Sequence, residues 1–262
     1  MNSRRRTRLT RALGLAALAS AVFAAVQGLV IMGPTVEQHD YSRLLVVHPP
    51  LATATYLAFG VTALASLAYL VPRTRRPQWD QLAAASAEIG VVFCALTLVT
   101  GSIWGRPTWG VWWTWDARLT TTALLLALFL GYLALRRIPA AGDVRSKRAA
   151  VAALFAAADI PIVHYATKWW QTLHQGQTFR ILQPDKNVGG PQLTGLLAGF
   201  LTMTLVYCWL LVHRYRVEQL EQRFEREGLE TALKQRRAEA ADVGVTVSAS
   251  TSTSAAAGAG AR

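Results

Sequence analysis

Residues 119–135 read LTTTALLLALFLGYLAL and contain no charged side chain. Such a run approaches the length that a helix needs to cross roughly 30 Å of hydrocarbon. Five similar runs occur, at residues 12–33, 44–71, 82–103, 149–167 and 193–212. Hydrophobic residues make up 52% of the 262-residue chain and charged residues only 16%, and the apolar residues are gathered into these blocks. The sequence therefore predicts an all-α, polytopic membrane protein with six transmembrane helices.

The basic side chains predict how these helices are oriented. The formal net charge of +12 could by itself indicate nucleic-acid binding. Lys and Arg are instead concentrated in alternate connections, at residues 4–11, 73–76 and 136–148. Because such connections usually face the cytoplasm, we expect both termini inside, residues 104–116 outside, and a lipid bilayer rather than nucleic acid as partner. A cleaved signal peptide at the basic start would leave the other five spans oriented in the same way.

Composition divides the chain into three parts. Residues 1–213 hold the six apolar runs and are predicted to form the membrane domain. Residues 214–240 are charged, and this composition with regularly spaced apolar side chains predicts a cytoplasmic amphipathic helix. The apolar side chains at roughly helical spacing are Val217, Leu220, Phe224, Leu229 and Leu233. Residues 241–262 are mostly Ala, Ser, Thr and Gly without periodicity, so they cannot bury enough apolar surface to order themselves. We expect a disordered tail there.

The chain lacks the motifs that identify most enzymes and covalent cofactor sites. Its two cysteines, Cys94 and Cys208, lie inside apolar runs, and no Cys-x-x-Cys or Cys-x-x-Cys-His pattern occurs. A disulfide framework, a zinc knuckle and a covalent c-type haem site are therefore excluded, and both cysteines are predicted to be small core residues. A nucleotide-binding glycine loop and a nucleophile elbow are also absent from the sequence.

The connection at residues 104–116 reads WGRPTWGVWWTWD and holds five of the nine tryptophans: Trp104, Trp109, Trp112, Trp113 and Trp115. Tryptophan prefers the headgroup layer of a membrane, but this preference explains one or two per helix end rather than five in one connection. In a helical turn, the tryptophans at 109, 112 and 113 would share one face with Asp116. Such a face is a flat apolar platform, which suits a wide planar ligand such as haem.

Histidines supply candidate ligands for haem iron. His48 lies where the second span begins, beside Pro49 and Pro50, and His164 lies at the outer end of the fifth span. Because both are predicted at outer membrane depth, two neutral imidazoles could approach opposite faces of a haem through Nε2. A histidine near a helix end is more often a hydrogen-bonded structural group, but the tryptophans at the same depth favour ligands. His174 is an alternative ligand or a donor to a propionate.

Cationic side chains near this surface suit the two haem propionates. Arg106 and Arg118 flank the tryptophans, and Lys168 lies one helical turn beyond His164, so each could pair with a carboxylate. Ordinary snorkelling of long cationic side chains at the interface is the alternative. Asp116 would repel propionates, so we expect it to orient an indole or an arginine rather than to bind iron.

Two acidic residues lie within the apolar runs, where a charge costs roughly 2.5 to 3.5 kcal/mol on insertion scales. Asp159 shares a run with His164 and could hold a water molecule or stabilise a kink at Pro161. Glu88 lies nearer the cytoplasmic end of its run and could reach water. Neither residue predicts a reaction.

Two segments resemble the CcmC family, haem-handling membrane proteins of System I cytochrome c maturation and members of the WWD-domain superfamily. They are TGSIWGRPTWGVWWTWDARLT at residues 100–120, and IPIVH with the following WWQTLHQ at 160–175. The resemblance covers about residues 12–212. It implies that His48 and His164 are external ligands of a b-type, non-covalent haem, and that the tryptophan segment docks haem and its acceptor. The charged extension and Ala-rich tail after Arg214 depart from the family pattern.

The same resemblance implies where the protein acts and with which partners. Members lie in the cell inner membrane and present haem to the periplasmic chaperone CcmE, which captures it covalently. CcmD and the ATPase and permease subunits CcmA and CcmB belong to the same assembly. The resemblance therefore implies delivery without catalysis, in which this chain holds haem and the acceptor performs the capture.

Three other functions remain open from the sequence. A b-type cytochrome linked to quinone would also use paired histidines, but it would more often bury them at mid-helix depth and needs no external tryptophan connection. A haem-free permease subunit of an ABC transporter would leave the tryptophans and histidines unexplained. A System II synthase shares a tryptophan-rich segment, but we expect it to bring a larger partner domain than 262 residues allow.

Overall fold

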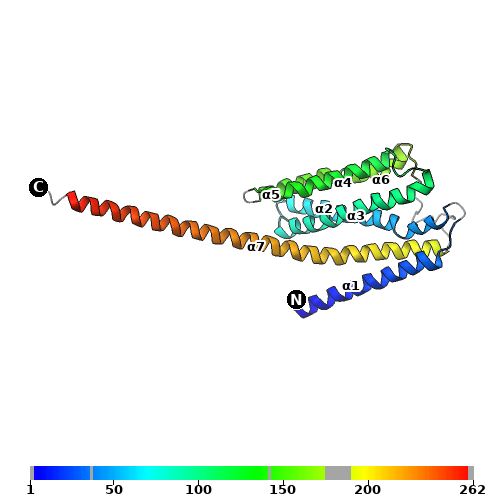
Figure 1. Ribbon diagram of the computed structural model, residues 1–262, viewed down its shortest axis with the longest axis horizontal. Helices are drawn as coiled ribbons and strands as arrows, with labels where there is room; N and C mark the ends of the chain where they lie inside the picture. The colour runs from blue at the N-terminus through cyan, green and yellow to red at the C-terminus, as the bar shows by residue number, and fades with distance from the viewer. Residues whose placement is uncertain (1–2, 36–37, 141–142, 175–189, 259–262) are drawn as a thin grey trace. The chain divides into compact units, whose positions relative to one another are not determined.

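The structure, a computed structural model, describes residues 3–35, 38–140, 143–174 and 190–258, and of residues 3–6, 226 and 240–258 only the backbone. The described residues are almost entirely helical and contain no strand. The elements are α1 (Ser3–Val26), the π-helix η1 (Gln27–Ile31), the 3-10 helix η2 (Asp40–Val46), α2 (His48–Leu70), α3 (Pro77–Trp109), α4 (Ala117–Arg136), α5 (Val144–Ala157), α6 (Asp159–Trp169) and α7 (Gly190–Gly258). Figure 1 labels the helices.

In the part of the chain that the structure describes, six helical segments are long and apolar enough to cross a membrane, which confirms the predicted fold class. They are Thr7–Ile31, Asp40–Leu70, Pro77–Trp109, Ala117–Arg136, Val144–Trp169 and Gly190–Glu239. The predicted runs fall inside these segments, apart from one or two residues at two of their ends. Length and composition were therefore sufficient to find every span.

The fifth span is interrupted at Ala158, where α5 ends and α6 begins. Pro161 lies three residues further along, and a proline in a helix interior clashes with the carbonyl group four residues before it. That carbonyl belongs to Ala157, the last residue of α5. Restarting the helix at Asp159 places Pro161 in the first turn of α6, where its missing N–H group costs little.

The chain forms two compact units, Met1–Arg216 and Val217–Arg262. In the second unit α7 continues as helix to Gly258, although the composition of residues 241–262 predicts disorder. The predicted division into membrane domain, amphipathic helix and disordered tail stays a prediction.

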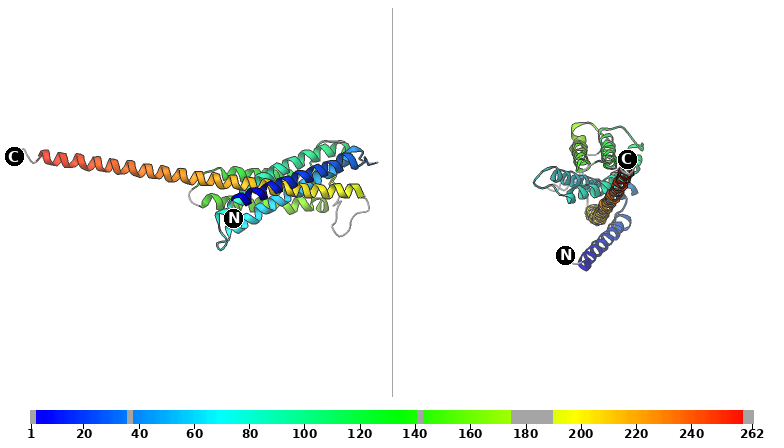
Figure 2. Two further views of the ribbon diagram at one scale, coloured as in Figure 1. Left: turned by 90° about the horizontal axis from the view of Figure 1, so that it is seen from below. Right: turned by 90° about the vertical axis from the view of Figure 1, so that its left-hand side faces the viewer.

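α2, α4 and α5 enclose the main apolar core of the first unit. Phe59 of α2 and Phe129 of α4 are fully buried and stack with ring centroids 3.7 Å apart and planes within 6°. Ala149 and Ala153 of α5 belong to the same cluster, and their small side chains let the helices approach closely. The helices run side by side in Figure 1, and the end-on view of Figure 2 places α1 and α4 at opposite edges of this unit.

Two ion pairs join helices near the end of the bundle that lies away from the tryptophan connection. Arg136 of α4 donates hydrogen bonds of 2.6 and 3.1 Å to the carboxylate of Asp80 in α3. Arg214 of α7 donates two hydrogen bonds to the Glu88 carboxylate, one of 2.8 Å. Glu88 therefore pairs with an arginine, where the sequence suggested only access to water, and the pairing offsets the cost of a charge in this span.

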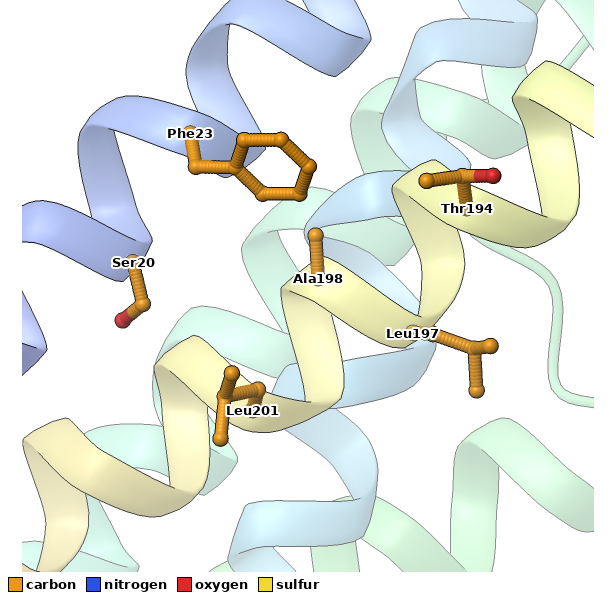
Figure 3. Close-up of a pocket in the computed structure, with 6 residues that line it drawn as sticks. All are labelled: Ser20, Phe23, Thr194, Leu197, Ala198 and Leu201. Carbon is orange, nitrogen blue, oxygen red and sulfur yellow. The ribbon is translucent and has the colours of Figure 1, made fainter.

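An open cavity of about 450 Å³ lies between α1 and the first part of α7. Figure 3 shows its lining residues: Ser20, Phe23, Thr194, Leu197, Ala198 and Leu201. The lining is almost entirely apolar and contains no nitrogen or sulfur ligand for iron. The cavity therefore contributes nothing to the histidine and tryptophan site described next.

Candidate functional site

The tryptophan connection begins inside a helix and then leaves it. α3 continues to Trp109 and ends at Gly110, whose φ of 78° lies in the left-handed region that glycine adopts without strain. The Gly110 N–H donates to the Arg106 carbonyl oxygen at 3.0 Å and closes the last turn. Residues 111–116 form neither helix nor strand. A shared helical face from Trp109 to Asp116 was expected only if the segment formed a helical turn, and the left-handed glycine ends the helix before that.

The tryptophans of this connection differ in exposure. Trp112 and Trp115 are 60% and 78% exposed, whereas the other three are partly buried. The indole N–H groups of Trp104 and Trp113 are buried and have no hydrogen-bond acceptor among the described residues. A buried donor without an acceptor costs about 1–3 kcal/mol, so an acceptor carried by a ligand would stabilise both. Carboxylate oxygens such as those of a haem propionate have the required chemistry.

His48 opens α2 and faces α3. Its Nδ1 lies 3.0 Å from Thr100 Oγ1, and its ring meets that of Trp104 edge to face with centroids 5.7 Å apart. Thr100 and Trp104 both belong to α3, one turn apart, so they hold the imidazole from the same helix face. A neutral histidine that donates a hydrogen bond through Nδ1 keeps the lone pair on Nε2 for a metal.

His174 lies against the tryptophan connection. Its Nδ1 donates to Asp116 Oδ2 at 3.1 Å, and its ring meets that of Trp109 at a centroid distance of 4.8 Å. An ionised carboxylate only accepts hydrogen bonds, so the contact assigns the proton to Nδ1 and leaves a lone pair on Nε2. His48 meets Trp104 and His174 meets Trp109, so both imidazoles lie against residues of the tryptophan connection. Both imidazoles therefore belong to one site.

Burial lowers the pKa of His174 below its usual value of 6.5, although the hydrogen bond and charge of Asp116 oppose the change. The nearby Arg118 charge acts in the same direction as burial. A lowered pKa keeps the imidazole neutral near pH 7. Neutrality is the state that an iron ligand needs, since a protonated imidazole has no lone pair.

His164, the second ligand predicted from the sequence, lies in a different environment. Its ring meets Tyr56 of α2 at a centroid distance of 6.2 Å and Tyr165 of its own helix at 4.9 Å, both edge to face. The Tyr56 hydroxyl interacts with the Arg118 guanidinium. The structure thus connects His164 to Arg118 through a tyrosine, whereas His174 contacts a tryptophan of the connection directly.

The three predicted cations have different neighbours. Arg118 interacts with Tyr56 and is close enough to His48 for their charges to interact, so it lies among the predicted ligands. Arg106 donates to the Gly110 carbonyl oxygen and serves the end of its own helix. Lys168 lies over the Tyr165 ring, with Nζ 5.0 Å from the centroid. Arg118 is therefore the cation best placed for a ligand carboxylate between the histidines.

Asp116 is the centre of this end of the molecule. Oδ1 accepts the Leu119 N–H at 2.8 Å and caps α4. Oδ2 accepts the Leu173 N–H at 3.3 Å in addition to the His174 bond. Asp116 was predicted to orient an indole or an arginine. The partner in that prediction is wrong, because the segment after α6 brings His174 to the Asp116 carboxylate.

Asp159 is 4% exposed, and its Oδ2 has no hydrogen-bond partner among the described residues. It opens α6 directly after the interruption at Ala158. Cys94 and Tyr56 lie near Asp159. Cys94 is fully buried and Cys208 half-buried, as expected of core residues.

Sequence reasoning missed three residues that shape the site: Thr100, Gly101 and Tyr56. A Cβ on Gly101 would lie 3.0 Å from His48 Cε1, so glycine leaves room for the ring. Thr100 and Gly101 stand in the segment that resembles the CcmC family, and that was the one available signal. Tyr56 lies in an apolar run without a motif, and only packing reveals its contact with His164.

The residues at this site fit a haem. Two imidazoles present Nε2 lone pairs, tryptophans supply aromatic area, and two indole donors with Arg118 could serve carboxylates. When bound, haem would supply the iron and the planar macrocycle. The chain's own residues would hold it and leave it accessible beside the exposed Trp112 and Trp115.

Known proteins resemble this chain along most of its length. The family model described as CcmC, heme exporter protein C, matches residues 2–230. Heme exporter protein C of Haemophilus influenzae is 36% identical over 200 residues, covering 75% of this chain and 79% of the relative. The Bradyrhizobium diazoefficiens protein of the same name is 36% identical over 181 residues, with coverages of 69% and 68%. A putative cytochrome c biosynthesis ccmC-like mitochondrial protein of Arabidopsis thaliana is 32% identical over 181 residues, covering 69% of this chain and 67% of the relative. The chain belongs to the heme exporter protein C family, whose members handle haem during cytochrome c maturation.

Proposed function

We propose that this protein holds a b-type, non-covalent haem between His48 and His174, beside the tryptophan connection, and presents it to the chaperone CcmE. The observation that carries the proposal is the state of the two imidazoles. Each engages a neighbour through Nδ1, which leaves Nε2 for iron. Both lie against tryptophans of the same connection, His48 against Trp104 and His174 against Trp109, which supports a single site.

The choice of His174 over His164 as second ligand rests on surroundings. His174 lies against Trp109 and is held by Asp116, the carboxylate and histidine arrangement that orients many metal-bound imidazoles. His164 is packed edge to face against two tyrosines. His164 stays the alternative ligand, and its variant is part of the experiment below.

The remaining predicted residues would hold the periphery of the macrocycle. The unsatisfied indole donors of Trp104 and Trp113 and the guanidinium of Arg118 would serve the propionates. The exposed Trp112 and Trp115 would form a surface that the acceptor meets while it captures haem. Lys168 and Arg106 would contribute positive charge at the edge. No step of bond formation is assigned to this chain, so we propose delivery rather than catalysis.

The distribution of Lys and Arg supports an orientation in the cell inner membrane with both termini in the cytoplasm and the tryptophan connection outside. In that orientation haem is offered on the side where CcmE acts. CcmD and the ABC subunits CcmA and CcmB would then meet this chain within the membrane or on its cytoplasmic side. The charged segment 214–240 is the part of the chain that would reach a cytoplasmic ATPase.

The decisive experiment is the absorption spectrum of the detergent-purified protein beside four single variants: His48→Ala, His174→Ala, His164→Ala and His213→Ala. We expect a six-coordinate, bis-histidine spectrum in the wild type, and loss or conversion of that spectrum in the first two variants. His213→Ala is the matched control, because the His213 imidazole packs on Trp209 in α7 and lies outside the site. A colourless wild type would contradict the function, and full retention in His174→Ala with loss in His164→Ala would return the ligand to His164.

A further inference from the structure

One turn of α3, residues 97–101, contacts His48 through two different features. The Thr100 hydroxyl oxygen lies 3.0 Å from His48 Nδ1. Gly101 lies beside the ring, where a Cβ would be 3.0 Å from Cε1 and 3.8 Å from Nε2. The turn therefore contacts the Nδ1 edge and one flank of the imidazole.

The direction of the hydrogen bond follows from counting protons on Thr100. A threonine hydroxyl has a single proton to donate. Its oxygen lies 2.8 Å from the carbonyl oxygen of Leu96, four residues earlier in α3. Because a carbonyl oxygen can only accept, that proton is committed to Leu96, and the Thr100 oxygen is left to accept from His48. This hydrogen bond therefore requires a proton on His48 Nδ1.

Glycine at position 101 is what lets the ring lie this close to α3. The contact of 3.0 Å that a Cβ would make with Cε1 is tighter than ordinary van der Waals packing. Gly101 is in the interior of α3, where glycine costs roughly 0.5–1 kcal/mol relative to alanine. Close approach of the imidazole gives a physical reason for a residue that the helix alone would disfavour.

We propose that the Thr97–Gly101 turn is a positioning device that sets the tautomer and orientation of His48, with Thr100 as its main positioning residue. It holds the neutral imidazole with the proton on Nδ1 and the lone pair on Nε2 before any ligand arrives. The part of this inference that concerns iron rests on the proposed function. The tautomer itself does not, since it is a property of the ligand-free chain.

The test uses the full chain in detergent with Thr100→Val, which keeps the shape and removes the acceptor, and Thr100→Ser, which restores it. Nitrogen-15 NMR of histidine-labelled, haem-free protein reports which ring nitrogen carries the proton, with His48→Gln used to assign the signal. We expect the Nδ1–H form in wild type and Thr100→Ser, and a mixture of tautomers in Thr100→Val. An unchanged His48 signal in Thr100→Val would overturn the proposal.

Haem-loaded protein supplies a second measurement. Loss of the hydrogen bond from the His48 Nδ1–H makes the imidazole a weaker electron donor to iron. Thr100→Val should therefore raise the midpoint potential of the haem and lower haem affinity about 10- to 100-fold. Gly101→Ala should displace the ring and weaken low-spin coordination, while Gly60→Ala is the matched control, since nothing lies within 4 Å of its Cβ position. Wild-type potential and affinity in both Thr100→Val and Gly101→Ala would overturn the role toward iron. A wild type without haem would instead refute the proposed function and leave the NMR test standing.

Discussion

At the residue scale, Asp116 shows how one carboxylate can organise a site from two distant parts of the chain. It caps α4 through Leu119, and it accepts from His174, which lies 58 positions further along. The carboxylate can only accept, and so it assigns the His174 proton to Nδ1. The same side chain thus supports an element and sets the chemistry of a ligand.

Substitutions at Asp116 should separate these two roles. Asp116→Ala removes the helix cap and should lower the free energy of unfolding by about 1 kcal/mol, in addition to releasing His174. Asp116→Asn keeps an oxygen for the cap but offers His174 an amide N–H, which favours a proton on Nε2 and removes the lone pair from that nitrogen. We expect both variants to lose haem in absorption spectra, and only the alanine variant to lose thermal stability in detergent. Equal haem retention in Asp116→Asn and wild type would show that the carboxylate does not set the ligand.

At the element scale, α7 packs against the start of α2 at glycine positions. A Cβ on Gly199 would meet the backbone carbonyl oxygen of Val46 and lie 2.7 Å from a Pro50 ring carbon. Backbone atoms cannot move aside as a flexible side chain can. Val46 and Pro50, each two positions from His48, are therefore held in place partly by the absence of a side chain on Gly199.

Gly199→Ala should consequently destabilise the bundle by about 1–3 kcal/mol through overpacking. Gly131→Ala in α4 is the control, because no atom lies within 4 Å of its Cβ position, and alanine should there be neutral or stabilising. Thermal unfolding in detergent, followed by circular dichroism, measures both variants. Equal melting temperatures for the two would contradict close packing of α7 on this part of the chain.

The interruption of the fifth span shows what sequence can predict about an element and what it cannot. Pro161 indicates a distortion in this run, and the structure has a break at Ala158. The end of α3 was less predictable, because spacing alone suggested a helical face that continues through the tryptophans. Gly110 decides this point, and a glycine in an otherwise amphipathic pattern can be either an interior residue or a left-handed cap.

At the scale of the whole molecule, function depends on which side of the membrane the tryptophan connection faces. Cysteines introduced at the exposed positions Val111 and Ile138 test this, in a background without Cys94 and Cys208. We expect a membrane-impermeant maleimide to label Val111→Cys in intact spheroplasts and Ile138→Cys only after permeabilisation, because basic residues flank the α4–α5 connection. The reverse pattern would place haem presentation on the cytoplasmic side and contradict the proposed function.

The number of membrane spans was predictable from sequence, because each span needs enough length and apolar composition within its own run of residues to cross the bilayer. The tryptophan connection and His48 were also predictable as parts of a haem site, since aromatic area and imidazole nitrogen are properties of residue types. The ion pairs Asp80–Arg136 and Glu88–Arg214 were not, because each joins residues of different helices. Pairing between helices depends on how they are arranged, which composition does not encode.

By itself the sequence determined that this is a six-span helical membrane protein with a tryptophan-rich connection and histidines near it, because membrane insertion is a local property of each run of residues. Only the tertiary structure decided that His174 lies against that connection while His164 packs among tyrosines, and that Thr100 faces His48. The physical reason is that a hydrogen bond requires donor and acceptor within about 3 Å in space, and separation along the chain does not specify that distance.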